Sequence, residues 1–120
     1  MRATLQPGIT GEAQHVVTAA MSPPHLPRVV LSTPSMIGLI EQTCLASVQG
    51  HLDEGETTVG THVCVSHEAA ALEGEDVVFR TRLSKVERRR LTFDVQVEGP
   101  RGLLSKGTHE RAAVLLDRMG

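Results

Sequence analysis

The hydrophobic pattern of the chain separates one apolar helical segment from several segments that alternate between apolar and polar residues. Residues Thr33–Val48 (TPSMIGLIEQTCLASV) are apolar over several helical faces and predict the only long helix. Thr33 is the expected N-cap, and Pro34 suits the first helical position because its missing N–H costs nothing there. Gly50 fits the C-terminal stop.

Period-two alternation and β-branched residues predict strands elsewhere in the chain. The segment Leu91–Val97 is the most regular, because every second residue is apolar. The predicted strands are Glu12–Met21, Thr57–Ala71, Asp76–Val86, Leu91–Val97 and Leu103–Leu116. The proline-rich segment Ser22–Pro27 must be a loop, since proline lacks the donor that a helix or central strand needs.

The predicted order is one strand, one helix and then four antiparallel strands joined by short turns. This order predicts a two-layer α+β domain covering residues 1–120. A helix that is apolar around so much of its circumference needs to be wrapped by a curved sheet. The expected architecture is therefore a hot-dog fold, with one long central helix wrapped by a five-stranded antiparallel sheet. We also expect a homodimer, because one copy leaves a sheet edge and an apolar rim uncovered.

Composition excludes several classes of partner. The net charge of −2 does not predict a surface that binds nucleic acid, and with two Phe and no Trp or Tyr the chain lacks base-stacking platforms. The first residues have no apolar signal-peptide region, and no apolar run approaches the length of a membrane span. We therefore expect a cytoplasmic protein. Its two cysteines, Cys44 and Cys64, are expected to be reduced, and their spacing is no metal signature.

Glu41 is the most unusual residue of the predicted helix, because it is the only formally charged residue between Val29 and Leu52. Its helical neighbours cannot ionise at neutral pH; they are Ile37, Gly38, Cys44, Leu45 and Val48. A carboxylate within an apolar stripe must be desolvated, paired or used in chemistry. We interpret Glu41 as a candidate catalytic acid or base.

Two further candidates follow from the predicted elements. Alternation along the strand puts His67 on the face of Val63 and Val65, and packing of that face on the helix would bring His67 into the layer of Glu41 as an acid–base partner. Thr33 offers a hydroxyl at the helix start. The alternative interpretations are a simple N-cap for Thr33 and a hydrogen-bonded core residue for His67.

The predicted helix start also offers backbone donors. The N–H groups of Ser35 and Met36 should be free to hold a substrate oxygen. Other polar residues carry weaker expectations. Arg88–Arg90 falls at a hairpin tip, where it is solvated or grips phosphates. His109 and Glu110 are expected to be cross-strand partners rather than catalysts.

Three sequence blocks resemble the fluoroacetyl-CoA thioesterase family of hot-dog proteins. These blocks are Thr33–Glu41 (TPSMIGLIE), Gly60–His67 (GTHVCVSH) and Gly107–Ala112 (GTHERA), and the likeness extends from about Val30 to Leu116. The resemblance implies a homodimeric acyl-CoA thioester hydrolase that needs no metal or other cofactor, since coenzyme A is part of the substrate. It also implies catalytic roles for Thr33, Glu41 and His67, and places Gly60 against the substrate.

The segment before the helix departs from the family. The fluoroacetyl-specific enzyme has a longer segment there, with phenylalanines that form a lid, whereas Met21–Ser32 contains no aromatic residue. Substrate specificity therefore does not carry over, and a short or medium acyl group is expected. The alternative is a non-catalytic hot-dog protein that binds acyl-CoA or another small ligand. A hot-dog dehydratase has less support, because its Asp-x-x-x-x-His pairing is missing.

Overall fold

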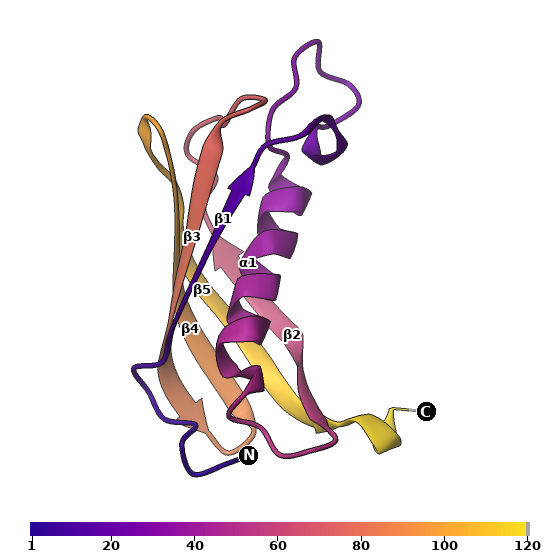
Figure 1. Ribbon diagram of the computed structural model, residues 1–120, viewed down its shortest axis with the longest axis vertical. Coiled ribbons are helices and arrows are strands. Elements are labelled where there is room, and N and C mark those ends of the chain that lie inside the picture. The colour runs from indigo at the N-terminus through magenta and orange to yellow at the C-terminus, as the bar shows by residue number, and fades with distance from the viewer. Residues whose placement is uncertain (120) are drawn as a thin grey trace.

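The computed structural model describes residues 1–119 and contains one long helix that lies against one face of a five-stranded sheet (Figure 1). The helix α1 spans Thr33–Gln49, within one residue of the prediction. The strands are β1 (Thr10–Val16), β2 (Glu56–Val65), β3 (Asp76–Glu87), β4 (Arg90–Gly99) and β5 (Gly102–Leu115). Short 3₁₀ turns follow β1 and β5, at Ala19–Met21 and Leu116–Arg118.

The strand order is β1-β3-β4-β5-β2, and every neighbouring pair is antiparallel. The helix contacts β1, β2 and β3, so the sheet curls around it. This arrangement confirms the predicted α+β class and the wrapped helix. Two strands are shorter than predicted. β1 ends at Val16, after which the chain turns through Ala19–Met21. β2 ends at Val65, and ten residues separate it from the start of β3 at Asp76.

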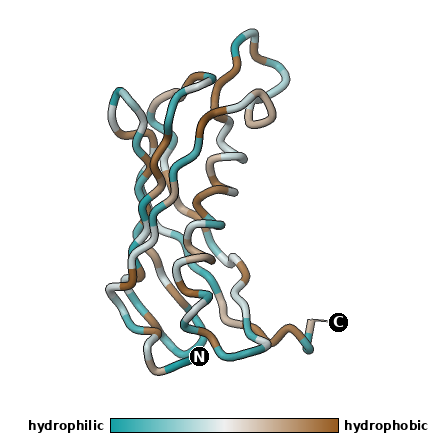
Figure 2. Tube along the Cα trace, in the orientation of Figure 1, coloured by the Kyte–Doolittle hydropathy of each residue, from teal (hydrophilic) through white to brown (hydrophobic). Residues whose placement is uncertain are grey.

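The core lies between the helix and the concave face of the sheet. The tube in Figure 2 changes colour from residue to residue along the strands, as expected for a sheet with one buried face. On the helix the buried face carries Met36, Ile40, Cys44 and Val48. The largest buried side chains of the sheet are Phe79, Leu83, Leu91, Phe93 and Leu104.

The helix begins one residue earlier than its predicted cap. Ser32, not Thr33, is the N-cap: its backbone is extended and its Oγ accepts a hydrogen bond from the N–H of Ser35 at 3.2 Å. Thr33 is the first residue of α1, which leaves its hydroxyl free of any capping role. The prediction of Thr33 as N-cap is therefore wrong, because a serine one position earlier satisfies the same donor.

The loop before the helix projects from the end of the molecule at which α1 begins (Figure 1). Its base is fixed, since Ser32 N–H donates to Met21 O at 2.8 Å and Leu31 N–H donates to Ala71 O at 2.9 Å. The segment between these anchors has no regular secondary structure, as the prolines predicted, and exposes Leu26. Within residues 1–119, no helix is both long and apolar enough to span a membrane.

Candidate active site

The structure brings Thr33 and His67 together. Thr33 Oγ1 lies 2.7 Å from His67 Nδ1, at the solvent-exposed start of α1. His67 reaches this position from the segment after β2 rather than from within the strand. It was predicted to be a strand residue that meets Glu41; the partner it contacts is the threonine. A hydroxyl hydrogen-bonded to an imidazole is a pair that can accept, hold and return a proton.

Glu41 lies at the edge of the buried face of α1, and its side chain keeps 39% of its surface exposed. Its Oε2 is 3.5 Å from Nη1 of Arg111, a buried arginine of β5. Glu41 also lies against Gly60: a Cβ at that glycine would come within 2.6 Å of Glu41 Oε2. The Glu41 carboxylate is therefore paired with Arg111, partly open to solvent and close to the backbone of Gly60.

Arg111 is a site residue to which the sequence assigned no role. Arg111 as a whole is 5% exposed, and its guanidinium donates from Nε to Thr58 Oγ1 at 2.7 Å and from Nη2 to Thr58 O at 2.8 Å. Burial lowers the pKa of Arg111, and the nearby Glu41 opposes that shift. Alternation along GTHERA puts His109 and Arg111 on the same face of the strand. Two polar residues on an inward face are the sequence signal that could have identified Arg111 as a site residue.

A β-bulge in β2 adjusts which of its residues face the helix. Register with β5 passes from Gly60↔Arg111 to His62↔Glu110, so Thr61 has no partner in that ladder. Before the bulge the even-numbered residues face inward, and after it the odd-numbered residues do. The bulge therefore sets Gly60 against Glu41 and turns His62 outward, where its Nδ1 lies 3.4 Å from Glu110 Oε2. The predicted cross-strand role of Glu110 is confirmed.

The N–H groups expected to hold a substrate oxygen are not free. Ser35 N–H donates to Ser32 Oγ, and Met36 N–H donates to Ser32 O at 2.9 Å. The expectation of open donors at Ser35 and Met36 is therefore wrong, because the serine cap uses both. The bulged backbone at Gly60–Thr61 lies beside Glu41.

Two adjoining hollows follow the exposed side of α1. One is lined by Met21, Ser35, Gly38, Leu39 and Gln42, and the other by Gly38, Glu41, Gln42, Leu45 and Arg111. They share Gly38 and Gln42. A Cβ at Gly38 would meet no atom within 4 Å, so this glycine opens the floor of the groove. The groove leads from the loop before the helix to the Glu41 carboxylate.

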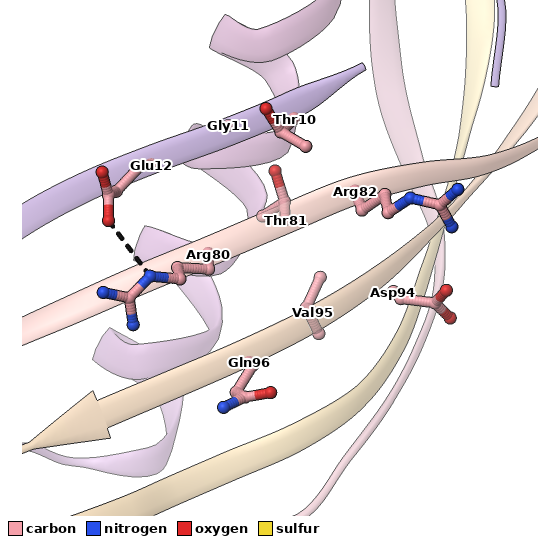
Figure 3. A pocket seen from close by; sticks show the side chains of 9 residues that line it. All are labelled: Thr10, Gly11, Glu12, Arg80, Thr81, Arg82, Asp94, Val95 and Gln96. Carbon is pink, nitrogen blue, oxygen red and sulfur yellow. Dashed lines mark hydrogen bonds and ion pairs between the residues drawn. The ribbon is translucent and has the colours of Figure 1, made fainter. Parts of the chain in front are cut away.

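A separate hollow of about 410 Å³ lies over β1, β3 and β4 (Figure 3). Its charged side chains come from the exposed positions of these strands, and Glu12 pairs there with Arg80 at 3.1 Å. None of the predicted site residues lines it. At the hairpin tip, Arg88, Arg89 and Arg90 are all exposed, and Arg89 Nη2 lies 3.1 Å from Glu56 Oε2. Within residues 1–119, no three His, Cys, Asp or Glu side chains gather where a metal ion could bind.

Comparison with known proteins identifies the family of this chain. A family model described as "fluoroacetyl-CoA-specific thioesterase" matches residues 12–117. The fluoroacetyl-CoA thioesterase of Streptantibioticus cattleyicolor is 37% identical over 89 residues, which are 74% of this chain and 64% of that protein. The chain thus spans a little under two thirds of this curated relative.

Solved structures of this family, and of another hot-dog-like protein, are also similar to this chain. A mutant of the fluoroacetyl-CoA-specific thioesterase FlK, in complex with fluoroacetate and CoA, superposes with a TM-score of 0.89 at 30% identity, covering 97% of this chain and 100% of that one. A hot-dog-like protein from Thermanaerovibrio acidaminovorans has a TM-score of 0.87 at 24% identity, covering 94% and 86%. The predicted hot-dog fold is confirmed, and the chain belongs to the fluoroacetyl-CoA-specific thioesterase family.

Proposed function

We propose that this protein hydrolyses an acyl-CoA thioester that carries a short or medium acyl group. The observation that carries the proposal is the Thr33 Oγ1–His67 Nδ1 contact of 2.7 Å, which sets a hydroxyl and an imidazole on an open surface. Glu41, eight residues along the same helix, supplies a carboxylate beside the groove. Membership of the family, and a relative solved with fluoroacetate and CoA, support the reaction class.

In the proposed reaction, water adds its oxygen to the thioester carbonyl carbon and the C–S bond breaks. Glu41 either takes a proton from the attacking water, or attacks the carbonyl itself to form an acyl-enzyme anhydride that water then hydrolyses. His67 delivers the proton that converts the departing thiolate to the free thiol of CoA. Thr33 is either a nucleophile or a hydrogen-bond anchor for the acyl group. The products are a carboxylic acid and CoA.

The groove beside α1 supports the choice of acyl group. Its apolar part, between Met21 and Leu39, is where an acyl chain would lie, and its far end reaches Glu41. Coenzyme A enters as part of the substrate, and the mechanism uses no metal. The loop over the helix start contains three prolines and no aromatic residue, so nothing there would limit the site to a two-carbon acyl group.

We further propose a homodimer whose active sites are shared between two copies. The strand β2 is a sheet edge with Gly60, Thr61, His62 and Cys64 exposed, so a second sheet could pair there. Thr33 and Glu41 are separated by about 12 Å along the helix axis, which is far for two groups acting on one carbonyl. A two-fold axis would allow Glu41 of one copy to meet Thr33 and His67 of the other.

Release of free thiol from acetyl-CoA and longer acyl-CoAs tests the proposed reaction directly. Saturable thiol release is expected. Binding of acyl-CoA without thiol release would instead make the protein a ligand-binding module of the same fold.

We propose that the protein acts in the cytoplasm, and its two free thiols, Cys44 and Cys64, agree with a reducing compartment.

Mixing two inactive variants tests the shared site. In a mixed dimer of Glu41→Gln and His67→Ala, a shared site leaves one of the two active sites intact, so activity should return on mixing. Sites confined to one chain would remain inactive after mixing. Light scattering that reported only monomers at micromolar concentration would contradict the dimer itself.

A further inference from the structure

A buried hydrogen-bond chain runs from the backbone of β2 through His109 to Arg111. His109 is fully buried in β5, and its ring stacks on Phe93 with the ring centres 6.4 Å apart. Its Nδ1 lies 2.8 Å from the carbonyl oxygen of His62, which can only accept a hydrogen bond. Nδ1 therefore carries the proton.

The opposite ring nitrogen then has a free lone pair. Arg111 Nη1 lies 3.1 Å from His109 Nε2, and a guanidinium can only donate. The same Nη1 lies 3.5 Å from Glu41 Oε2. One nitrogen thus contacts both the imidazole and the carboxylate, while the other guanidinium nitrogens are held by Thr58.

We infer that His109 is a positioning residue: as the neutral Nδ1–H tautomer, it directs Arg111 Nη1 to the place where it contacts Glu41. This inference rests on the proposed thioesterase function for its kinetic consequence, but its hydrogen-bond geometry does not. His109 is fully buried and is not itself a catalytic residue. It acts by fixing the cation that orients the Glu41 carboxylate.

Charge explains why the neutral ring is required. A proton on Nε2 would replace the acceptor with a donor and set two cations in contact. Burial is the largest influence on the pKa of His109 and lowers it; Arg111 lowers it too, whereas the His62 carbonyl, Glu41 and Glu110 raise it. The net shift is downward, so the ring is neutral at neutral pH.

Two substitutions separate the two ring nitrogens. In His109→Gln the amide oxygen can reach the place of Nε2 and accept from Arg111. In His109→Asn the amide nitrogen can reach the place of Nδ1 and donate to His62, but nothing accepts from Arg111. We expect kcat of His109→Asn to fall about 10- to 100-fold with KM little changed, since a small misplacement of a catalytic group has this effect. His109→Gln should stay close to wild type.

The pH profile provides a second readout. The wild type should lose kcat as the pH falls and His109 is protonated, and His109→Gln should lack that component because its amide does not titrate. Equal loss of kcat in both variants, in step with their loss of thermal stability, would make His109 merely structural. Full activity of a folded His109→Asn variant would overturn the inference.

The wild-type protein also tests the inference without any activity. The ¹⁵N chemical shifts of the His109 ring at neutral pH should report a protonated Nδ1 and an unprotonated Nε2. A protonated Nε2 or a cationic ring would overturn the inference even if the enzyme hydrolyses acyl-CoA. Conversely, absence of thiol release together with the expected tautomer would refute the proposed function and leave the hydrogen-bond chain in place.

Discussion

The hydroxyl of Thr33 lies 2.7 Å from Nδ1 of His67, although 34 positions separate the two residues in the chain. The contact exists because Ser32 caps α1 and so releases Thr33 from that task. The helix start therefore divides its work between adjacent residues: Ser32 satisfies the backbone donors, and Thr33 faces the imidazole.

This division makes two neighbouring substitutions distinguishable. Thr33→Ala should reduce turnover with little effect on unfolding, because the hydroxyl makes no capping bond. Ser32→Ala should lower the free energy of unfolding by about 1 kcal/mol through the lost cap. Thermal unfolding and acyl-CoA hydrolysis measured on both variants check this. A large loss of stability in Thr33→Ala would contradict the assignment of the cap.

Glu41→Gln should keep the fold and remove turnover. The side chain is 39% exposed and the amide has the same shape, so folding should be unaffected, but an amide can neither attack nor take a proton. We expect kcat to fall at least about 100-fold. Glu54→Gln, which changes an exposed acid in the turn before β2, is the matched control. Near wild-type hydrolysis by Glu41→Gln would refute the catalytic role.

Gly60→Ala should impair catalysis rather than folding. The new methyl group would come within 2.6 Å of Glu41 Oε2 and 3.3 Å of the His109 ring. The end of the flexible Glu41 side chain can move away, and the ring would need to shift by only a few tenths of an ångström. Displacement of the carboxylate should lower kcat about 10- to 100-fold. Gly107→Ala is the contrasting variant, because its methyl group would lie 2.0 Å from the Cys64 carbonyl oxygen and should prevent normal folding. Circular dichroism and kinetics together distinguish the two outcomes.

The preference for fluoroacetyl-CoA over acetyl-CoA should be small. Fluorine and hydrogen differ little in size, and apolar pockets discriminate such near-isosteres weakly by contact alone. The segment Met21–Ser32 has no aromatic residue to close over the acyl group, so water and longer acyl chains should enter. The ratio of kcat/KM for the two substrates measures the preference. A preference of several orders of magnitude would mean that specificity resides outside this loop.

The two thiols should react at very different rates. Burial raises the pKa of the Cys44 thiol to about 12, whereas Cys64 is exposed on the edge strand. A thiol reagent applied to the folded protein should label Cys64 alone, and labelling of both cysteines should require denaturant. Because the folded-state pKa of Cys44 is raised, its contribution to stability is lost as the pH rises above the ordinary thiol pKa. Rapid labelling of a folded Cys64→Ser variant would contradict the burial of Cys44.

Local pattern was sufficient to predict the helix, the five strands and the wrapped arrangement, but not the ends of β1 and β2 or the N-cap of α1. An apolar segment with proline near its start predicted α1, and alternation predicted β3 and β4 with their buried faces. These features depend on residues that are close in the sequence, because the period of apolar residues in a short segment favours either a helix or a strand. Glu41 was also identified locally, because a single carboxylate within an apolar helix is unusual.

Tertiary structure decided which polar groups meet. The contact of Thr33 with His67, and that of Glu41 with Arg111, depend on the end of β2, the bulge after Gly60 and the register of β5. Each of these is a long-range property, because strand register is set by the packing of the whole sheet rather than by either strand. For the same reason the chain alone predicted three candidate catalytic residues, but not the supporting contacts that run from the buried His109 through Arg111 to one of them.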